Sequence, residues 1–394
     1  MSAPAASRGT SPLVVQCLVF LCFAMPLGVF PSAWPEARSM FDQSAAALGT
    51  LATAYGIGRL STSASASLLL ARVSVRSVTV ALCLALALVD VGLAVSRSFA
   101  LALVGIALIG LASGGLDSLG SRYQAVIRDV RRSGLMFGSY GVGATLGPLV
   151  VAVSSWTVGF AAAAGVATVA ALAAARPGVE WPEGMADPPR RQRVGVAPVS
   201  FDRRGVALSL ALAGTVVALE ANTGNWMATY FEDFRGSSGQ AAALAVSGFW
   251  AGVTLGRLLL GSVRVSAAWI LTRAPVAVVV GYAVVALVPR TVAMVGLVGV
   301  GALLGVLFPT VTATTVDRAG AAAAGRVSGW QLFAANLTAT TVIAGVGIGV
   351  SHWGEGVPMV ALVGLAVVAV PLCWRGAVRV PPDEPALGPV PPPA

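Results

Sequence analysis

A cluster of polar and aromatic side chains follows a long apolar run near the middle of the chain. The run 206–219 leads directly into Glu220, Asn222, Trp226 and Tyr230. A carboxylate in such apolar surroundings is costly, and it persists mostly where it faces a cavity or a functional path. Carboxamides hydrogen-bond polar organic groups, and aromatic rings stack on planar ones. These residue types predict proton binding at Glu220 and contact with an organic molecule around it.

Asp117 is a second acid within an apolar run, and Arg59 and Arg257 are two arginines in equivalent runs. Asp117 could carry a proton like Glu220, or it could be a structural partner of Arg59. Glu220 could likewise form a permanent pair with Arg257. Since an unpaired charge in lipid is expensive, and since both halves of the chain contain such an arginine, we expect Arg59 and Arg257 to be structural.

The composition explains why these charges are isolated. The 394 residues are 57% hydrophobic and only 10% charged, whereas a soluble domain usually carries about 25% charged residues. A chain this apolar cannot hide its hydrophobic surface from water, so lipid must be part of its solvent. We therefore expect a lipid bilayer as its surroundings.

The apolar runs are long enough to be membrane-spanning helices. A helix needs about 20 residues to cross a hydrocarbon core, and only helices or closed barrels satisfy their backbone there. Each run is too long for a barrel strand. We predict twelve spans, near residues 13–34, 46–70, 77–96, 98–121, 134–154, 157–175, 206–231, 240–262, 266–288, 291–315, 327–350 and 357–374.

A proline-rich polar segment divides the spans into two sets of six. We expect an N-terminal bundle over 1–175, a cytoplasmic linker over 176–205 and a C-terminal bundle over 206–376. The proline-rich end, 377–394, is expected to be a disordered cytoplasmic tail. The predicted fold class is an all-α membrane protein of two pseudo-symmetric six-helix bundles.

The arginines indicate the orientation. Most lie in the segments that share a side with the linker, and the opposite side holds only Arg38, Arg97, Arg235 and Arg290. This positive-inside bias predicts a multi-pass protein of the cell membrane with both termini cytoplasmic. It also accounts for the net charge of +9 without a nucleic-acid partner.

The two halves contain related motifs. Gly58-Arg59-Leu60 in the second span corresponds to Gly256-Arg257-Leu258 in the eighth, half the chain away. Two related six-helix halves are a known layout of secondary transporters.

Motifs along the chain resemble the major facilitator superfamily, and within it the fucose-permease-like branch. The motifs that carry the resemblance are Glu220, Gly224, Trp226 and Tyr230 of span 7, the run 249–258 (FWAGVTLGRL) of span 8, 114–117 (GGLD), 140–148 (YGVGATLGP), 308–310 (FPT) and 329–331 (GWQ). The resemblance covers about residues 13–374. It implies the fold of that superfamily and transport by alternating access.

The chain departs from the superfamily pattern in the loop between spans 2 and 3. Arg72 and Arg76 keep the two arginines of that loop and are expected at the inner gate, but Ala71 stands in place of its acid. Ser121 and Phe137 stand where the branch often has Asn and His. These two changes argue against carbohydrate specificity.

Six side chains are the candidates to line a substrate cavity, because they can hydrogen-bond or stack on a solute. The alternative for each is packing between helices. They are Asn222, Trp226, Gln331, Asn336, Tyr55 and Tyr140.

We predict a secondary active transporter, not an enzyme, that moves a small organic solute with protons and acts as a monomer. Export of a metabolite or drug is favoured, and uptake of a sugar-like solute is the alternative. A membrane enzyme or sensor is a more remote one, since the chain has a single histidine, four dispersed cysteines and no phosphate-binding loop. No metal or cofactor is expected.

Overall fold

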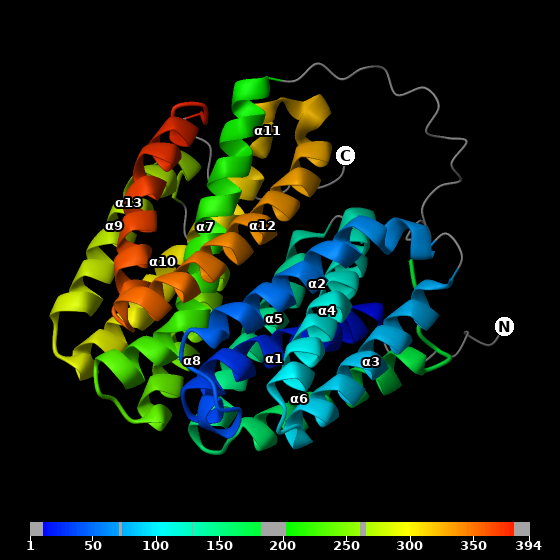
Figure 1. Cartoon of the computed structure of the whole chain (residues 1–394). Coiled ribbons are helices and arrows are strands. Elements are labelled where there is room, and N and C mark those ends of the chain that lie inside the picture. Colours follow the sequence, from blue (N-terminus) through cyan, green and yellow to red (C-terminus); the bar gives the residue numbers. More distant parts are fainter. Residues whose placement is uncertain (1–10, 71–72, 128, 183–201, 261–264, 382–394) are drawn as a thin grey trace.

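The computed structural model describes residues 11–70, 73–127, 129–182, 202–260 and 265–381, and these are helical apart from short connections (Figure 1). The first half contains six helices: α1 (Pro12–Met40), α2 (Ala47–Leu70), α3 (Val75–Val95), α4 (Phe99–Ile127), α5 (Val130–Ala152) and α6 (Trp156–Ala175). The second half contains α7 (Arg203–Thr229), the π-helix η2 (Tyr230–Phe234), α8 (Gly239–Leu260), α9 (Ala267–Leu287), α10 (Arg290–Ala313), the short α11 (Thr315–Ala319), α12 (Ala321–Trp353) and α13 (Val357–Ala377). The predicted all-α fold of two six-helix halves is confirmed.

Short polar side chains begin several of the helices. Ser74, Ser155 and Ser266 each accept a hydrogen bond from a backbone N–H in the first turn of the helix that follows. Asp202 does the same for α7. These bonds satisfy N–H groups that the helix itself cannot pair, so the helix starts follow directly from the sequence.

Helix α1 is longer than the predicted span. It continues to Met40 although it contains Pro26, Pro31 and Pro35. A proline removes one backbone hydrogen bond and bends a helix, but neighbouring helices can support such a helix in a membrane protein. The extension places Arg38 beyond the apolar part of α1, close to η2.

Glycines allow equivalent pairs of helices to pack closely in the two halves. A Cβ on Gly58 of α2 would lie 2.1 Å from the carbonyl oxygen of Ala107 in α4, and one on Gly110 of α4 would lie 2.0 Å from that of Tyr55. In the second half, a Cβ on Gly252 of α8 would lie 2.1 Å from the carbonyl oxygen of Val298 in α10. Only glycine permits such backbone contact, so close packing at glycines joins α2 to α4 and α8 to α10.

The two halves meet along α5 and α8 and along α2 and α12. Ser247 of α8 donates a hydrogen bond of 2.9 Å to the backbone oxygen of Thr145 in α5. On the other side, Gly49 of α2 and Gly347 of α12 bring their backbones together. These two contacts hold the halves together on either side of a cavity between them.

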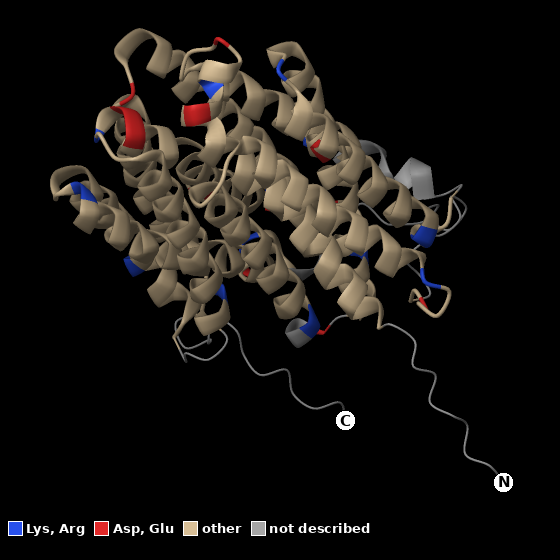
Figure 2. Ribbon diagram, turned by 90° about the horizontal axis from the view of Figure 1, so that it is seen from below, with Lys and Arg blue, Asp and Glu red and all other residues tan. Residues whose placement is uncertain are grey.

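Eleven of the described helices are long and apolar enough to cross a membrane. α2 is not one of the eleven, because its fully described part, residues 47–62, is shorter than such a span. Figure 2 shows that most charged positions lie near the ends of helices. Exposed side chains such as Leu88 and Val295 are apolar, as expected for a surface that faces lipid.

Much of the predicted 176–205 linker, residues 183–201, lies outside the described residues. Its described beginning is held by Arg76, whose Nη2 donates hydrogen bonds of 3.0 and 2.8 Å to the backbone oxygens of Pro177 and Val179. The domain boundaries stay a prediction. The predicted tail, 377–394, is described only to residue 381.

Candidate functional site

A cavity of about 110 Å³ lies between the two halves. Both halves contribute to its wall, through α1, α2 and α5 on one side and α7, α8 and α12 on the other. The lining residues are Leu27, Ala52, Tyr55, Gly56, Arg59, Tyr140, Val217, Glu220, Ala221, Gly224, Asn225, Trp250, Asn336, Ala339, Thr340 and Ile343.

Arg59 enters the cavity from α2 and is held from behind by an acid of α4. Its Nη2 lies 2.6 Å from Oδ2 of Asp117, and its Nη1 donates a hydrogen bond of 3.0 Å to the hydroxyl of Tyr55. Asp117 itself does not line the cavity. The structure thus contains the Arg59–Asp117 pair that was the structural alternative for this acid.

Glu220 enters the cavity from α7 and is held by an arginine of α8. Nη2 of Arg257 lies 2.7 Å from Oε1 and 2.9 Å from Oε2 of Glu220. The Glu220 side chain is 9% exposed, so it is largely removed from solvent. Arg257 does not line the cavity.

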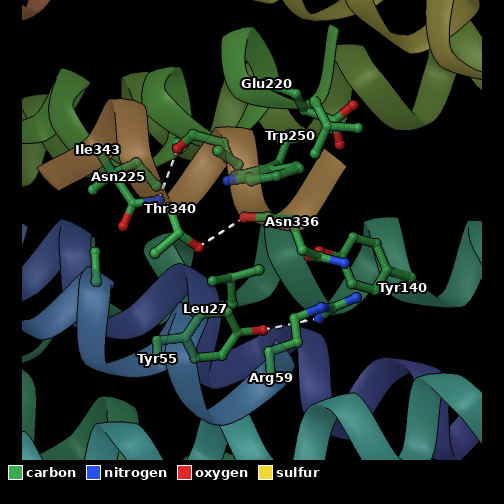
Figure 3. Close-up of a pocket in the computed structure, with 16 residues that line it drawn as sticks. Leu27, Tyr55, Arg59, Tyr140, Glu220, Asn225, Trp250, Asn336, Thr340 and Ile343 are labelled. Atoms are coloured by element: carbon green, nitrogen blue, oxygen red, sulfur yellow. Dashed lines mark hydrogen bonds between the residues drawn. The ribbon is translucent and has the colours of Figure 1, made fainter. Parts of the chain in front are cut away.

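The two ion pairs therefore present opposite charges to the cavity. A guanidinium faces it from the first half and a carboxylate faces it from the second, while Asp117 and Arg257 stand behind them. Figure 3 shows Arg59 and Tyr55 on one side and Glu220 and Trp250 on the other, with Asn336 and Tyr140 between them. The formal charges of the two pairs cancel, so the site suits a solute of zero net charge that carries both donors and acceptors.

Two polar atoms on neutral side chains of the lining have no hydrogen-bond partner among the described residues. They are the indole Nε1 of Trp250, a donor, and the amide Oδ1 of Asn225, an acceptor. Leaving a buried polar atom unpaired costs about 1–3 kcal/mol. A solute or ordered water that accepts from Trp250 and donates to Asn225 would remove this cost.

Three of the six cavity residues predicted from the sequence line the cavity: Tyr55, Tyr140 and Asn336. Tyr140 packs edge-on against Trp250, with ring centroids 6.5 Å apart. Asn336 lies on the same face of α12 as Thr340, whose hydroxyl donates to the Asn336 backbone oxygen.

The other three lie outside the lining. Asn222 points away from Glu220 and donates to the Ala218 backbone oxygen of its own helix. Trp226 is fully buried near Gly49 and Gly347, where α2 and α12 meet. Gln331 donates to the Ser209 backbone oxygen and accepts from Thr315, so it joins α12 to α7 and to α11.

Asn225 and Trp250 are cavity residues that the candidate set lacked. The lining positions of α7 are 217, 220, 221, 224 and 225, which is the spacing of one helix face. Counting from Glu220 along that face leads to Gly224 and the neighbouring Asn225 rather than to Asn222 or Trp226. Gly224 does not leave open space beside Glu220, since the Trp250 ring occupies it: a Cβ there would lie 2.7 Å from Cζ2.

The predicted gate loop is only partly described. Ala71 and Arg72 lie outside the described residues. Arg76 binds the backbone after α6, as given above, and this contact holds α3 to the start of the linker segment.

Comparison with known proteins agrees with this architecture. Residues 15–342 match the family model described as Major Facilitator Superfamily. No curated protein matches the chain.

Several solved structures have the same fold at low sequence identity. A D-xylose-proton symporter aligns with a TM-score of 0.75 at 14% identity over 94% of this chain and 98% of its own. A bacterial homologue of the human lysosomal transporter Spinster, in an inward-facing and occupied conformation, gives 0.73 at 14% identity over 96% and 98% of the two chains. A variant of the nucleoside transporter NupG gives 0.72 at 15% identity over 93% and 98%.

The matched segment covers most of the chain, and the solved structures share its arrangement of helices. The fucose-permease-like branch stays a prediction. The chain belongs to the Major Facilitator Superfamily and is a multi-pass membrane transporter rather than an enzyme.

Proposed function

We propose that the chain moves a small organic solute of zero net charge through the central cavity and couples this movement to protons at Glu220. The observation that carries the proposal is the place of Glu220, which lines the cavity while its ion-pair partner Arg257 stands behind it. Glu220 is the only carboxylate among the lining residues of the described chain. Protonation of Glu220 would release Arg257, so proton and solute act on the same arrangement of helices.

Other groups near Glu220 are neutral or cationic. Tyr140 of α5 and Tyr282 of α9 lie close enough to interact electrostatically with it, and Tyr140 also interacts with Arg59. The Tyr282 hydroxyl is paired with the hydroxyl of Thr223, at 2.5 Å. The described lining holds no second acid that could replace Glu220 as the proton carrier.

For direction, we propose export of a metabolite or drug. The apolar and aromatic lining, which includes Leu27, Val217, Ile343 and Trp250, suits an amphipathic solute better than a polyol. The changes at Ser121 and Phe137 support this less directly, since neither residue lines the cavity.

Uptake of a sugar-like solute is the second candidate. The side-chain amides of Asn225 and Asn336 and the unpaired indole N–H of Trp250 favour it, and the D-xylose-proton symporter has the same fold. In both cases we expect a monomer in the cell membrane with cytoplasmic termini. We also expect the chain to divide into bundles at the 176–205 linker.

The test is transport by the purified chain in liposomes with an imposed pH gradient, with chloramphenicol, D-xylose and uridine as probes. Glu220→Gln should lose gradient-driven accumulation and keep exchange of solute without a gradient. Accumulation of D-xylose, with chloramphenicol inactive, would favour uptake over export. Gradient-driven accumulation by Glu220→Gln equal to that of the native chain would refute the coupling role.

A further inference from the structure

A second hollow lies on the outer surface of the second half, between α9 and α13. It offers about 870 Å³ and is lined by Thr272, Arg273, Val276, Ala277, Val280, Gly281 and Trp374. None of these residues lines the central cavity. This hollow, called the outer groove below, is therefore separate from the proposed transport path.

The groove is polar at one end and apolar along the rest. Its α9 residues recur at intervals of four, from Thr272 and Arg273 to Val280 and Gly281, so they form one face of the helix. At 1.5 Å per residue this face is roughly 13 Å long. A polar end followed by an apolar channel of this length matches the headgroup and upper acyl chain of a phospholipid.

Arg273 is the charged residue at the polar end. It is exposed and lies in the second turn of α9, inside a helix that can span the membrane. No ion pair among the described residues involves it. An arginine at this depth is stable when its guanidinium reaches the interface or an anion.

Trp374 of α13 forms the opposite wall of the polar end. Its indole Nε1 donates a hydrogen bond of 2.9 Å to the backbone oxygen of Thr272. Trp374 is 49% exposed, and tryptophan is typical of the membrane–water interface. The hydrogen bond fixes the ring beside Arg273, which places the groove opening at headgroup level.

We propose that the outer groove binds a phospholipid with an anionic headgroup, with its phosphate on Arg273 and one acyl chain along Val276, Val280 and Gly281. A guanidinium binds phosphate oxygens through two parallel hydrogen bonds. Arg375, exposed on α13 beside Trp374, adds positive charge at the same end. A headgroup with its own ammonium gains less from this charge than a net-negative one.

The test is native mass spectrometry of the full chain in detergent, titrated with phosphatidylglycerol or with phosphatidylcholine of the same acyl chains. We expect one tightly held phosphatidylglycerol and weaker binding of phosphatidylcholine. Arg273→Gln should weaken phosphatidylglycerol binding about fivefold, the effect of one basic residue at an anionic surface. Arg273→Lys should keep the preference.

Two further variants separate specific binding from general charge. Arg326→Gln removes an exposed arginine near the start of α12 and should leave binding unchanged. Ala277→Phe keeps Arg273 but fills the acyl path, and should weaken both lipids. Equal binding of the two lipids, or equal effects of Arg273→Gln and Arg326→Gln, would overturn the proposal. Unchanged binding by Ala277→Phe would overturn the assigned acyl path.

Discussion

Arg38 at the end of α1 and Asp233 in η2 form an ion pair that joins the two halves, with Nη2 and Oδ1 2.9 Å apart. The two side chains are 27% and 13% exposed, so solvent screens the pair only in part. It lies away from the central cavity, where α1 and α7 both end. Because the halves must separate somewhere for a solute to pass, this pair opposes separation at that end.

Arg38→Gln should therefore shift the chain toward conformations that are open at the end where η2 lies. A partly exposed pair contributes about 1 kcal/mol, which is about a fivefold change in population. Pulsed electron–electron distance measurements between spin labels at Ser39 and Ser238 would detect longer distances. Arg290→Gln is the matched control, since Arg290 binds the Gly236 backbone oxygen within its own half. Identical distance distributions in Arg38→Gln and the native chain would contradict the expectation.

Asp117→Asn should destabilise the first half. It leaves Arg59 without its carboxylate among mostly buried surroundings, and breaking a buried pair costs several kcal/mol. Since the two side chains are 12% and 16% exposed, we expect a loss of up to about 3 kcal/mol. Thermal unfolding of Asp117→Asn and the native chain in detergent would measure this loss of stability. The double change Arg59→Met with Asp117→Leu should recover most of the loss, and a double variant no more stable than Asp117→Asn would argue against this account.

Gly252→Ala should destabilise the contact between α8 and α10. The new Cβ would lie 2.1 Å from the Val298 carbonyl oxygen, and forced overpacking typically costs about 1–3 kcal/mol. Gly299→Ala on α10 is the control, because a Cβ there meets no atom within 4 Å. Alanine favours helix over glycine, so the control should be neutral or more stable. Similar melting temperatures for the two variants would show that α8 and α10 pack less closely at Gly252 than the structure indicates.

Trp250→Phe should weaken solute binding and leave proton coupling intact. The change keeps a ring over Gly224 but removes the indole donor that has no partner among the described residues. A lost hydrogen bond of about 1 kcal/mol raises KM about fivefold. Transport in liposomes at several solute concentrations would give KM with and without a pH gradient. A lost gradient dependence would mean that Trp250 also takes part in coupling.

The spans were predictable because lipid imposes length and hydropathy on each helix, and the repeated Gly-Arg-Leu motif predicted the equivalence of α2 and α8. Helix ends were less predictable: α1 passes three prolines that tertiary contacts support. The cavity residues were predictable only in part. Residue type alone does not tell Asn222, which bonds to its own helix, from Asn225, whose Oδ1 stays unpaired. What separates the two residues is their position around the axis of α7 relative to Glu220: Asn225 lies near the cavity face and Asn222 does not.

The acids of the two ion pairs come from helices that are not equivalent. Asp117 belongs to α4, but α10 contains no acid, and the only acid of α1, Glu36, lies in its last turns. The described cavity wall thus has one carboxylate. If Glu220 carries protons as proposed, coupling through it would involve one proton for each transport cycle. One charge across 100 mV is worth about 2.3 kcal/mol, and each 1.4 kcal/mol is a factor of ten. A neutral solute could then be concentrated at most roughly 50-fold per 100 mV of driving force.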